Sequence, residues 1–292
     1  MDIIIIGSGP AGISAALYSK RAGADVTVIS RGSGALAKAE KIENYYGLAG
    51  PVTGAELEAS GIAGAKRLGV NFVEDEVVGV AMNDDFTGLV VQTPNRTCEA
   101  KAVVLAAGST RLAPKIPGLK ELEGKGVSYC AICDAFFYRQ KTVAVLGEGE
   151  YALHEAEILL PHASKVMLFT NGKEPVVEIP DTIEVHKEKI IAVEAENENG
   201  MERVCGLRAE DGALTPVNGL FVALGTAGSV DLARKIGAGT ENNRVVVDGD
   251  MATNVPGLYA AGDCTGGLLQ VVKATYEGAV AGLAAAKYAR RS

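Results

Sequence analysis

The chain has 292 residues, 48% of them hydrophobic and 22% charged, so it can bury the cores of two modest domains. Its formal net charge of -8 argues against a nucleic acid as the main partner, because phosphate binding needs clustered basic side chains. No apolar run reaches the roughly 18 residues of a membrane helix, and a strand begins at residue 2 without space for a signal peptide, so we expect a cytoplasmic protein with no membrane partner.

The chain opens with a βαβ pattern, and the same pattern returns later. A continuous apolar strand, a helix and a second strand are predicted at 2–6, 10–23 and 25–30, and again at 141–147, 151–160 and 165–170. Two such units predict an α/β protein with two Rossmann-like (βαβ, three-layer) domains, the second inserted into the first. Prolines and glycines near 114–117 and 237–240 suit the crossings. The outer domain is predicted at 1–114 and 240–292, and the inserted domain at 115–239.

The turn after the first strand carries Gly7, Gly9 and Gly12, which fit the G-x-G-x-x-G pattern of dinucleotide sites. The first glycine permits the tight turn, the second lets the backbone approach a pyrophosphate, and the third lets helix and strand pack closely. The following helix then directs unpaired N–H groups at the phosphates. At the end of the second strand, where an acidic residue usually binds ribose, the chain has Ser30 and Arg31, so other groups must take that role.

A Cys-x-x-Cys pair, Cys130 and Cys133, is followed directly by Asp134 in "YCAICDAFF". A zinc site needs two more ligands at matching spacing, and the three histidines are scattered, so no metal is expected. A redox-active disulfide fits the spacing better than two buried structural thiols do. The five cysteines are too dispersed for a secreted disulfide framework.

The second glycine turn, in "VAVLGEGEYALHEA", departs from the pattern. Gly147 and Gly149 are in place, but Glu148 and Glu150 lie where a phosphate would bind, and Tyr151 stands at the helix N-terminus. Each glutamate opposes a pyrophosphate by about 1 to 4 kcal/mol at 4 Å, depending on the local dielectric.

Near the C-terminus, "LYAAGDC" places Asp263 at a strand end before glycines and a long helix. Alone it is typical of an N-cap, but together with the first glycine turn it indicates a flavin site, where the carboxylate takes hydroxyls of the ribityl chain. The adjacent Cys264 is interpreted as a structural buried thiol.

Four segments in this order resemble the low-molecular-weight thioredoxin reductases over essentially the whole chain: the first glycine turn, "IENYYG" at 42–47, "CAICD" and "AAGDCTGG". The resemblance implies a homodimer with FAD in the outer domain. It also implies that Cys133 faces the flavin, that the more accessible Cys130 attacks the thioredoxin disulfide, and that Asp134 manages the proton. Capping of the next helical turn is an alternative role for Asp134. Tyr46 stands where the family usually has proline.

The expected cofactor-binding residues come from the glycine turns, the strand ends and the flavin-facing asparagine of the family. They are Gly7, Gly9, Pro10, Ala11, Gly12, Ser30, Arg31, Asn44, Gly108, Gly262, Asp263 and Gln270.

NADPH-dependent members carry a third glycine in the second turn and a His-Arg-Arg cluster at the end of the next strand. Here that strand ends in Thr170, Asn171 and Gly172, with only Lys173 nearby. The chain therefore resembles the subgroup that takes electrons from ferredoxin, so that electrons pass from reduced ferredoxin through FAD and the disulfide to thioredoxin. Three alternatives stay open. The first is a reductase that uses NADPH or NADH, in which Glu174 could bind the ribose of NADH. The others are a reductase with a second flavin in the inserted domain, and a flavin-binding module without turnover.

Overall fold

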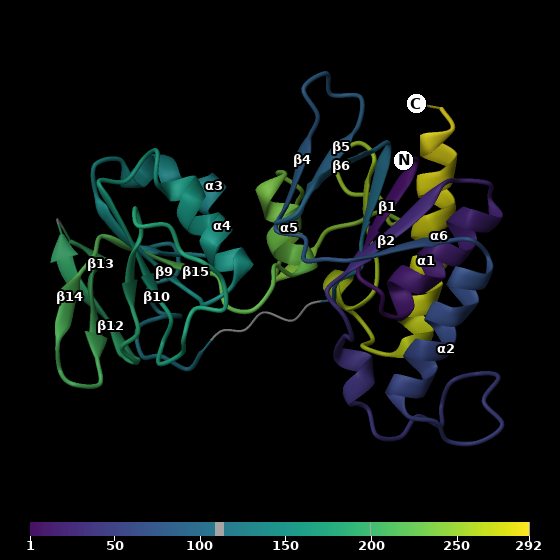
Figure 1. Ribbon diagram of the computed structural model, residues 1–292, viewed down its shortest axis with the longest axis horizontal. Coiled ribbons are helices and arrows are strands. Elements are labelled where there is room, and N and C mark those ends of the chain that lie inside the picture. The colour runs from purple at the N-terminus through teal and green to yellow at the C-terminus, as the bar shows by residue number, and fades with distance from the viewer. Residues whose placement is uncertain (109–113, 199, 292) are drawn as a thin grey trace. The chain divides into compact units, whose positions relative to one another are not determined.

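The structure is a computed structural model that describes residues 1–108, 114–198 and 200–291. It divides into two compact units, Met1–Thr110 with Gly228–Ser292 and Arg111–Ala227 (Figure 1). The chain leaves the first unit within 109–113, outside the described residues, and returns at Gly228. The return lies earlier than the crossing predicted at 239/240, because residues 229–235 form a helix that packs against strands of the first unit.

The main sheet of the first unit is parallel, in the order β18-β7-β1-β2-β3. The four isoleucines of its central strand are all buried, and Ile3 lies in register with Val26 on one side and Ala102 on the other. A strand covered on both faces needs such a continuous apolar run. The strands are β1 (Ile3–Ile6), β2 (Val26–Ser30), β3 (Asn71–Glu74), β7 (Ala102–Leu105) and β18 (Leu258–Ala260).

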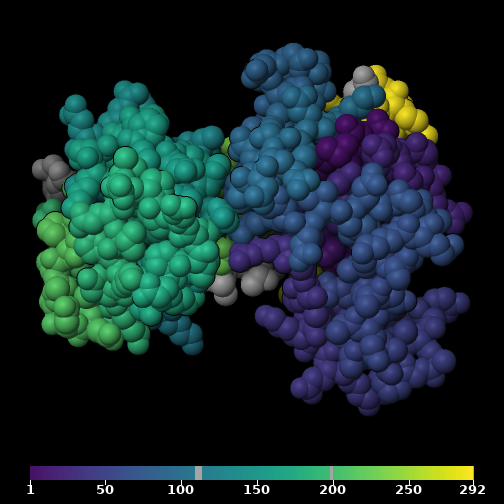
Figure 2. All heavy atoms as spheres, in the orientation of Figure 1, coloured from purple at the N-terminus to yellow at the C-terminus, as the bar shows by residue number. Residues whose placement is uncertain are grey.

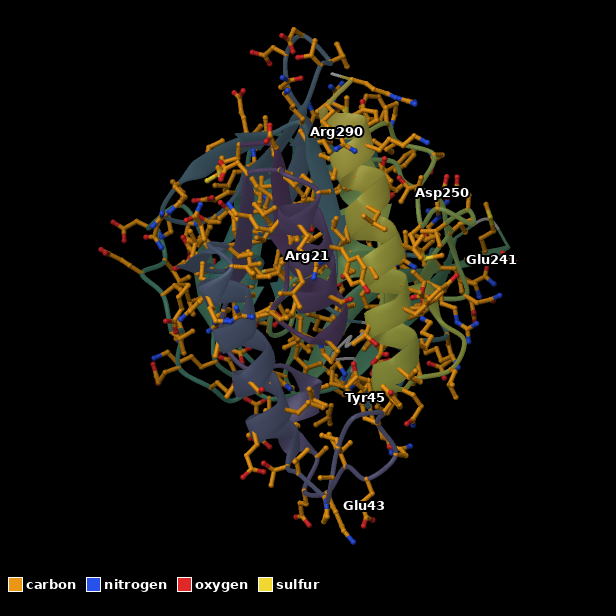
Figure 3. All side chains as sticks on the ribbon, turned by 90° about the vertical axis from the view of Figure 1, so that its right-hand side faces the viewer. Arg21, Glu43, Tyr45, Glu241, Asp250 and Arg290 are labelled. Carbon is orange, nitrogen blue, oxygen red and sulfur yellow. A yellow bond between two sulfur atoms is a disulfide. The ribbon has the colours of Figure 1, made fainter. Side chains whose placement is uncertain are left out.

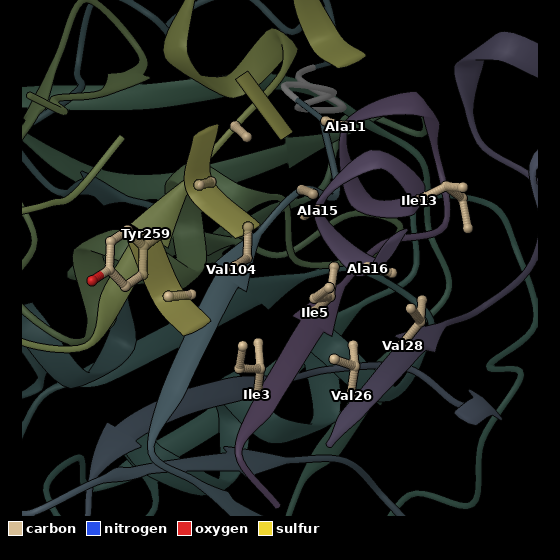
Figure 4. Close-up of a cluster of buried hydrophobic side chains, with 14 of the residues drawn as sticks. Ile3, Ile5, Ala11, Ile13, Ala15, Ala16, Val26, Val28, Val104 and Tyr259 are labelled. Carbon is tan, nitrogen blue, oxygen red and sulfur yellow. The ribbon is translucent and has the colours of Figure 1, made fainter. Parts of the chain in front are cut away.

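The helices of the first unit are α1 (Pro10–Arg21), α2 (Gly54–Arg67), α5 (Ser229–Lys235) and α6 (Val271–Ala289). Small residues let α1 and α6 cross closely: a Cβ at Gly278 would lie 2.1 Å from the backbone oxygen of Ala11, and a Cβ at Gly282 would lie 2.4 Å from that of Ala15. Apolar side chains from these helices and the sheet form one core (Figure 4). At the far end, Arg290 Nη1 donates to the carbonyl oxygen of Ala22 at 3.2 Å, joining the two helix ends (Figure 3).

Smaller elements complete the first unit. An antiparallel three-stranded sheet, β4-β5-β6, stands out at the surface (Figure 2), and α5 packs against β4, β7 and a short hairpin. They are β4 (Gly79–Met82), β5 (Leu89–Gln92), β6 (Thr97–Ala100), the hairpin β16 (Thr240–Glu241) and β17 (Arg244–Val245), and the 3-10 turns η1 (Ala35–Lys38) and η3 (Asp263–Thr265).

The second unit repeats the parallel architecture, in the order β11-β10-β9-β15-β8. Its strands are β8 (Val127–Ser128), β9 (Thr142–Leu146), β10 (Lys165–Phe169), β11 (Glu184–His186) and β15 (Gly219–Val222). An antiparallel sheet follows, with β12 (Ile190–Glu198), β13 (Met201–Ala209) and β14 (Leu214–Pro216). The helical elements are α3 (Ala131–Asp134), the 3-10 turn η2 (Ala135–Tyr138) and α4 (Glu150–Leu159). The predicted fold, two Rossmann-like domains with one inserted in the other, is confirmed. No helix among the described residues is long and apolar enough to cross a membrane.

Candidate active site

The first glycine turn joins β1 to α1 at the carboxyl edge of the main sheet. Gly7 has a φ of +108°, and a Cβ at Gly12 would lie 1.9 Å from the oxygen of Gly7, so both positions need glycine for the backbone itself. Gly9 differs, since a Cβ there would meet nothing within 4 Å. The helix starts at Pro10, and no side chain caps it. The turn therefore leaves open space in front of free backbone N–H groups, which suits a pyrophosphate.

The end of β2 is organised by an acid that sequence reasoning missed. Glu76 follows β3, is 5% exposed, and accepts a 2.7 Å hydrogen bond from Arg31 Nη1. Ser30 Oγ lies 2.9 Å from Ser8 Oγ, which links this strand end to the glycine turn. The available signal was the acidic run that ends the "NFVEDEVV" strand pattern, because the ends of adjacent parallel strands meet at one edge.

Two of the predicted cofactor residues are directly joined. Asn44 Nδ2 donates a 3.2 Å hydrogen bond to Gln270 Oε1, although 226 positions separate them in the chain. Gln270 is the residue before α6, and the loop with Glu43 and Tyr45 lies at that end of the helix (Figure 3). Tyr46 is 98% exposed. The contact places the asparagine loop beside the start of α6.

The "GDC" segment lies at the same carboxyl edge, after β18. A Cβ at Gly262 would lie 2.8 Å from the Cβ of Ala11, so this turn sits against the start of α1. Gly108, after β7, has a φ of +75°. The Asp263 carboxylate forms no hydrogen bond or ion pair with any of the described residues, so it does not make the N-cap bond that is typical of an Asp in this position. A carboxylate without a protein partner suits a hydroxyl-bearing ligand.

A half-buried ion pair that the sequence did not point out holds this turn. Lys273 and Glu277, one helical turn apart on α6, lie 2.8 Å apart, and both are less than 16% exposed. Glu277 Oε2 accepts from the amide of Gly262 at 2.9 Å, and Lys273 Nζ donates to the carbonyl oxygen of Gly262 at 2.7 Å. The i,i+4 spacing in "KATYE" was the only available signal.

Cys264 is a structural thiol in the sense predicted: it is fully buried, and its sulfur lies 3.4 Å from the carbonyl oxygen of Ala261. Burial raises the pKa of the Cys264 thiol to about 11. The thiol therefore stays protonated at neutral pH.

In the second unit, Cys130 and Cys133 form a disulfide with their Cα atoms 5.4 Å apart. Cys130, two residues after β8 and directly before α3, is 5% exposed, whereas Cys133 is exposed. The expectation that Cys130 is the more accessible cysteine is therefore wrong for this state, because Cys130 lies buried between β8 and α3 while Cys133 lies on the exposed side of α3.

Asp134 is tied to the cysteine pair by a serine. Ser128 Oγ donates to Asp134 Oδ2 at 2.6 Å and accepts from the amide of Cys130 at 3.1 Å. The side chain of Asp134 does not cap the turn that follows it. A second carboxylate, Glu155 of α4, accepts from the amide of Ala131 at 2.7 Å. Sequence reasoning missed Ser128 and Glu155, because neither belongs to the Cys-x-x-Cys pattern.

The second glycine turn is covered by its own chain. Glu148 Oε1 is ion-paired with Lys173 Nζ, and the backbone oxygen of Glu148 accepts from the amide of Val176 at 2.9 Å. A Cβ at Gly149 would lie 3.6 Å from Val176 Cγ2. The segment 173–176 thus lies across the turn. The predicted repulsion by Glu148 is partly neutralised by Lys173, and the same contact places protein atoms over the turn.

Two side chains next to this turn are buried. Tyr151, in the first turn of α4, is 2% exposed. Thr170 is fully buried, with its hydroxyl donating to the carbonyl oxygen of Lys173. Glu174, considered above as a ribose ligand, pairs with Lys187 at 2.6 Å.

A parallel-sheet nucleotide-binding unit, carrying an inserted unit of the same architecture with a Cys-x-x-Cys disulfide, defines a flavin-type disulfide oxidoreductase. Residues 1–278 match the family model described as pyridine nucleotide-disulphide oxidoreductase. A thioredoxin reductase of Aquifex aeolicus is 37% identical over 302 residues, covering 98% of this chain and 93% of that protein.

Solved structures agree. The atypical thioredoxin reductase TRi from Desulfovibrio vulgaris Hildenborough is 39% identical with a TM-score of 0.91, over 100% of this chain and 98% of the other. A ferredoxin-flavin thioredoxin reductase from Clostridium acetobutylicum is 32% identical with a TM-score of 0.73, over the same shares. The chain belongs to the pyridine nucleotide-disulphide oxidoreductases, and within them to the low-molecular-weight thioredoxin reductases. The expected cofactor, FAD, is that of the family, and the open first turn and the available Asp263 carboxylate fit it.

Proposed function

We propose that this thioredoxin reductase takes its electrons from reduced ferredoxin rather than from a nicotinamide nucleotide. The observation that carries the proposal is the segment 173–176, which lies across the second glycine turn through the Glu148–Lys173 ion pair and the Val176 amide. A nucleotide needs that turn open, as the first one is at Gly9.

Opening the turn has a free-energy cost before any ligand binds. The ion pair must separate, and the Val176 amide must find another acceptor. Glu148 is 16% exposed as a side chain, so its charge would then face a pyrophosphate with little water between them. With no arginine in the run 170–173, no guanidinium there offsets this cost for a 2'-phosphate. A ferredoxin donor avoids the turn altogether, and the likeness to the ferredoxin-flavin enzyme of C. acetobutylicum supports it.

For the first unit, we propose that the open turn receives the pyrophosphate of FAD on the amides that follow Gly9, with Pro10, Ala11 and the glycines shaping it. Asp263, Gly262 and Gly108 would contact the ribityl side of the cofactor. The joined pair Asn44–Gln270 would contact the flavin ring, and Ser30 and Arg31 the adenosine end. FAD, when bound, supplies a centre that accepts electrons singly and releases them in pairs.

For the second unit, we propose that the reduced pair acts by thiol-disulfide exchange. The Cys130 thiolate attacks one sulfur of the thioredoxin disulfide, and the other thioredoxin sulfur leaves as a thiolate that takes up a proton. Cys133 then attacks the Cys130 sulfur, which releases thioredoxin as a dithiol and restores the disulfide. Asp134, joined to this turn through Ser128, would hold the proton that these steps exchange. Cys130 is buried in the disulfide state, so the exchange requires a local movement that uncovers its sulfur.

We also propose a cytoplasmic homodimer, as the resemblance implies. The outer face of α6 carries exposed apolar side chains at Val272, Tyr276 and Leu283, which share one side of the helix and suit a subunit interface. Sedimentation of the wild type and a Tyr276→Glu variant tests this: a dimer that dissociates in the variant is expected, and a monomeric wild type overturns it.

The donor is tested anaerobically. The oxidised holoprotein is mixed separately with NADPH, NADH and reduced ferredoxin, and the loss of flavin absorbance is followed, then the appearance of thioredoxin thiols. Bleaching and thiol formation with ferredoxin alone are expected. Rapid bleaching by either nicotinamide overturns the proposal, and a flavin content of two per chain would instead indicate a second flavin in the inserted domain.

Two variants separate flavin reduction from thiol transfer. Cys130→Ser is expected to retain flavin bleaching by ferredoxin but to produce no thioredoxin thiols. Cys205→Ser, a cysteine of the same unit outside the pair, is the matched control and should behave as the wild type. Turnover of thioredoxin by Cys130→Ser would contradict the assigned role of Cys130.

A further inference from the structure

The first turn of the disulfide segment receives a carboxylate from outside the motif. Glu155 lies on α4, which packs against α3, and its side chain is 1% exposed. Its Oε2 accepts the N–H of Ala131 at 2.7 Å. That N–H belongs to the peptide unit that joins Ala131 to Cys130, so the carboxylate is one peptide group away from the first cysteine.

The backbone N–H groups of Cys130 and Ala131 are the groups that would stabilise a thiolate at Cys130. When the pair is reduced, a cysteine that precedes a helical turn gains from the unpaired N–H groups of that turn, and its thiol pKa falls. Here the Ala131 N–H is already taken by a carboxylate and the Cys130 N–H by Ser128. A negative group at this place opposes a nearby thiolate, since like charges in a buried setting repel.

A thiolate that is less stable makes the dithiol form less stable, and the couple becomes more reducing. This is the direction that a donor to thioredoxin needs. We propose that Glu155 is a positioning residue that keeps the Cys130–Cys133 pair strongly reducing, by holding a carboxylate against the first turn of α3.

Two other titratable groups follow the pair in sequence, Asp134 on α3 and Tyr138 on η2, and the charges of Asp134 and Arg203 both act on Tyr138. Burial, and then the charge of Asp134, raise the pKa of Tyr138, so this phenol stays neutral. Asp134 reaches the Cys130 amide only through Ser128, whose hydroxyl bonds to both. Glu155 is the carboxylate that bonds directly to the backbone of the turn.

The test is a redox titration of the full-length holoprotein. It is equilibrated in mixtures of reduced and oxidised dithiothreitol, quenched in acid and alkylated, and the peptide with Cys130 and Cys133 is weighed by mass spectrometry. No ferredoxin or nicotinamide is needed, so the outcome does not depend on the proposed donor.

Glu155→Gln keeps the shape and an acceptor for the Ala131 amide but removes the charge. We expect the equilibrium to move about tenfold toward the dithiol, which corresponds to about 30 mV for a two-electron couple, with faster alkylation of the reduced pair at pH 6. Glu157→Gln, an exposed glutamate of the same helix, is the matched control and should leave both quantities unchanged.

Glu155→Asp separates charge from packing, because it keeps the carboxylate on a shorter side chain. A tenfold shift in the Gln variant with little shift in the Asp variant supports the proposal. Equal shifts in both, or a Gln equilibrium within twofold of the wild type, overturn it. Failure of Glu155→Gln to fold also overturns it, because the carboxylate would then serve the fold rather than the potential.

Discussion

Ser128 joins Asp134 to the amide of Cys130: its hydroxyl donates to the carboxylate at 2.6 Å and accepts from the amide at 3.1 Å. The proposed proton carrier and the proposed attacking cysteine are therefore connected through a single side chain.

This connection predicts the effect of Ser128→Ala. Without the hydroxyl, Asp134 loses its orientation, and we expect thioredoxin reduction to slow by about tenfold. Asp134→Asn, which removes the proton-accepting group, should slow it on the order of a hundredfold. Steady-state rates against pH measure both. Ser164→Ala, at an exposed serine of the same unit, is the control, and a Ser128→Ala rate equal to it would contradict the connection.

The first glycine turn allows binding and folding to be separated. Gly9→Ala meets no protein atom within 4 Å, so the variant should fold but lose FAD affinity by tenfold or more, because its methyl group enters the space for the pyrophosphate. Gly12→Ala places a Cβ 1.9 Å from the Gly7 oxygen and should unfold the unit. Flavin content and urea unfolding distinguish the two. Gly64→Ala, in an open position of α2, should leave flavin content unchanged, and full flavin content in Gly9→Ala would rule out this placement.

Cys264 predicts a loss of stability in alkali. Burial raises the pKa of its thiol from 9.0 to about 11, so the folded chain holds the proton over a range in which the unfolded chain releases it. This stabilisation is complete below pH 9 and is lost as the pH rises toward 11, by about 2 kcal/mol at pH 10.5. Urea unfolding at pH 8 and pH 10.5 should show a smaller decrease for Cys264→Ala than for the wild type. Equal decreases would count against the raised pKa.

The Lys273–Glu277 pair should behave as a coupled unit. Lys273→Met leaves Glu277 partly buried without its cation, and we expect a loss of about 3 kcal/mol in the free energy of unfolding. The double variant Lys273→Met, Glu277→Gln should lose much less than the sum of the two single changes, because no uncompensated charge remains. Urea titrations of the four proteins give the coupling energy, and additive losses would refute the pairing.

Local pattern was sufficient for most of the fold. The isoleucine run of β1 and the apolar run at 142–146 predict buried strands, because a strand covered on both faces needs apolar side chains throughout. The disulfide followed from the Cys-x-x-Cys spacing, and the first glycine turn from its place between strand and helix.

The contacts that sequence reasoning missed join residues that lie far apart in the chain. Glu76 reaches Arg31 from the next strand end, Glu155 reaches Ala131 from another helix, and Lys173 reaches Glu148 from the loop after β10. Each looks like an ordinary surface charge in the sequence, because its partner is defined only by the packing of strands and helices. The accessibility of the two cysteines was misjudged for the same reason: it depends on how the segment between β8 and α3 packs.

The unequal exposure of the two sulfurs also guards the disulfide against small thiols. A free thiol can reach only Cys133, and the group it displaces is the sulfur of Cys130, which stays buried next to the bond it has lost. Because the Cys130 sulfur stays next to Cys133, it attacks the mixed disulfide and releases the small thiol before a second thiol from solution can react. Reduction of the Cys130–Cys133 disulfide by small thiols is thereby suppressed on kinetic grounds.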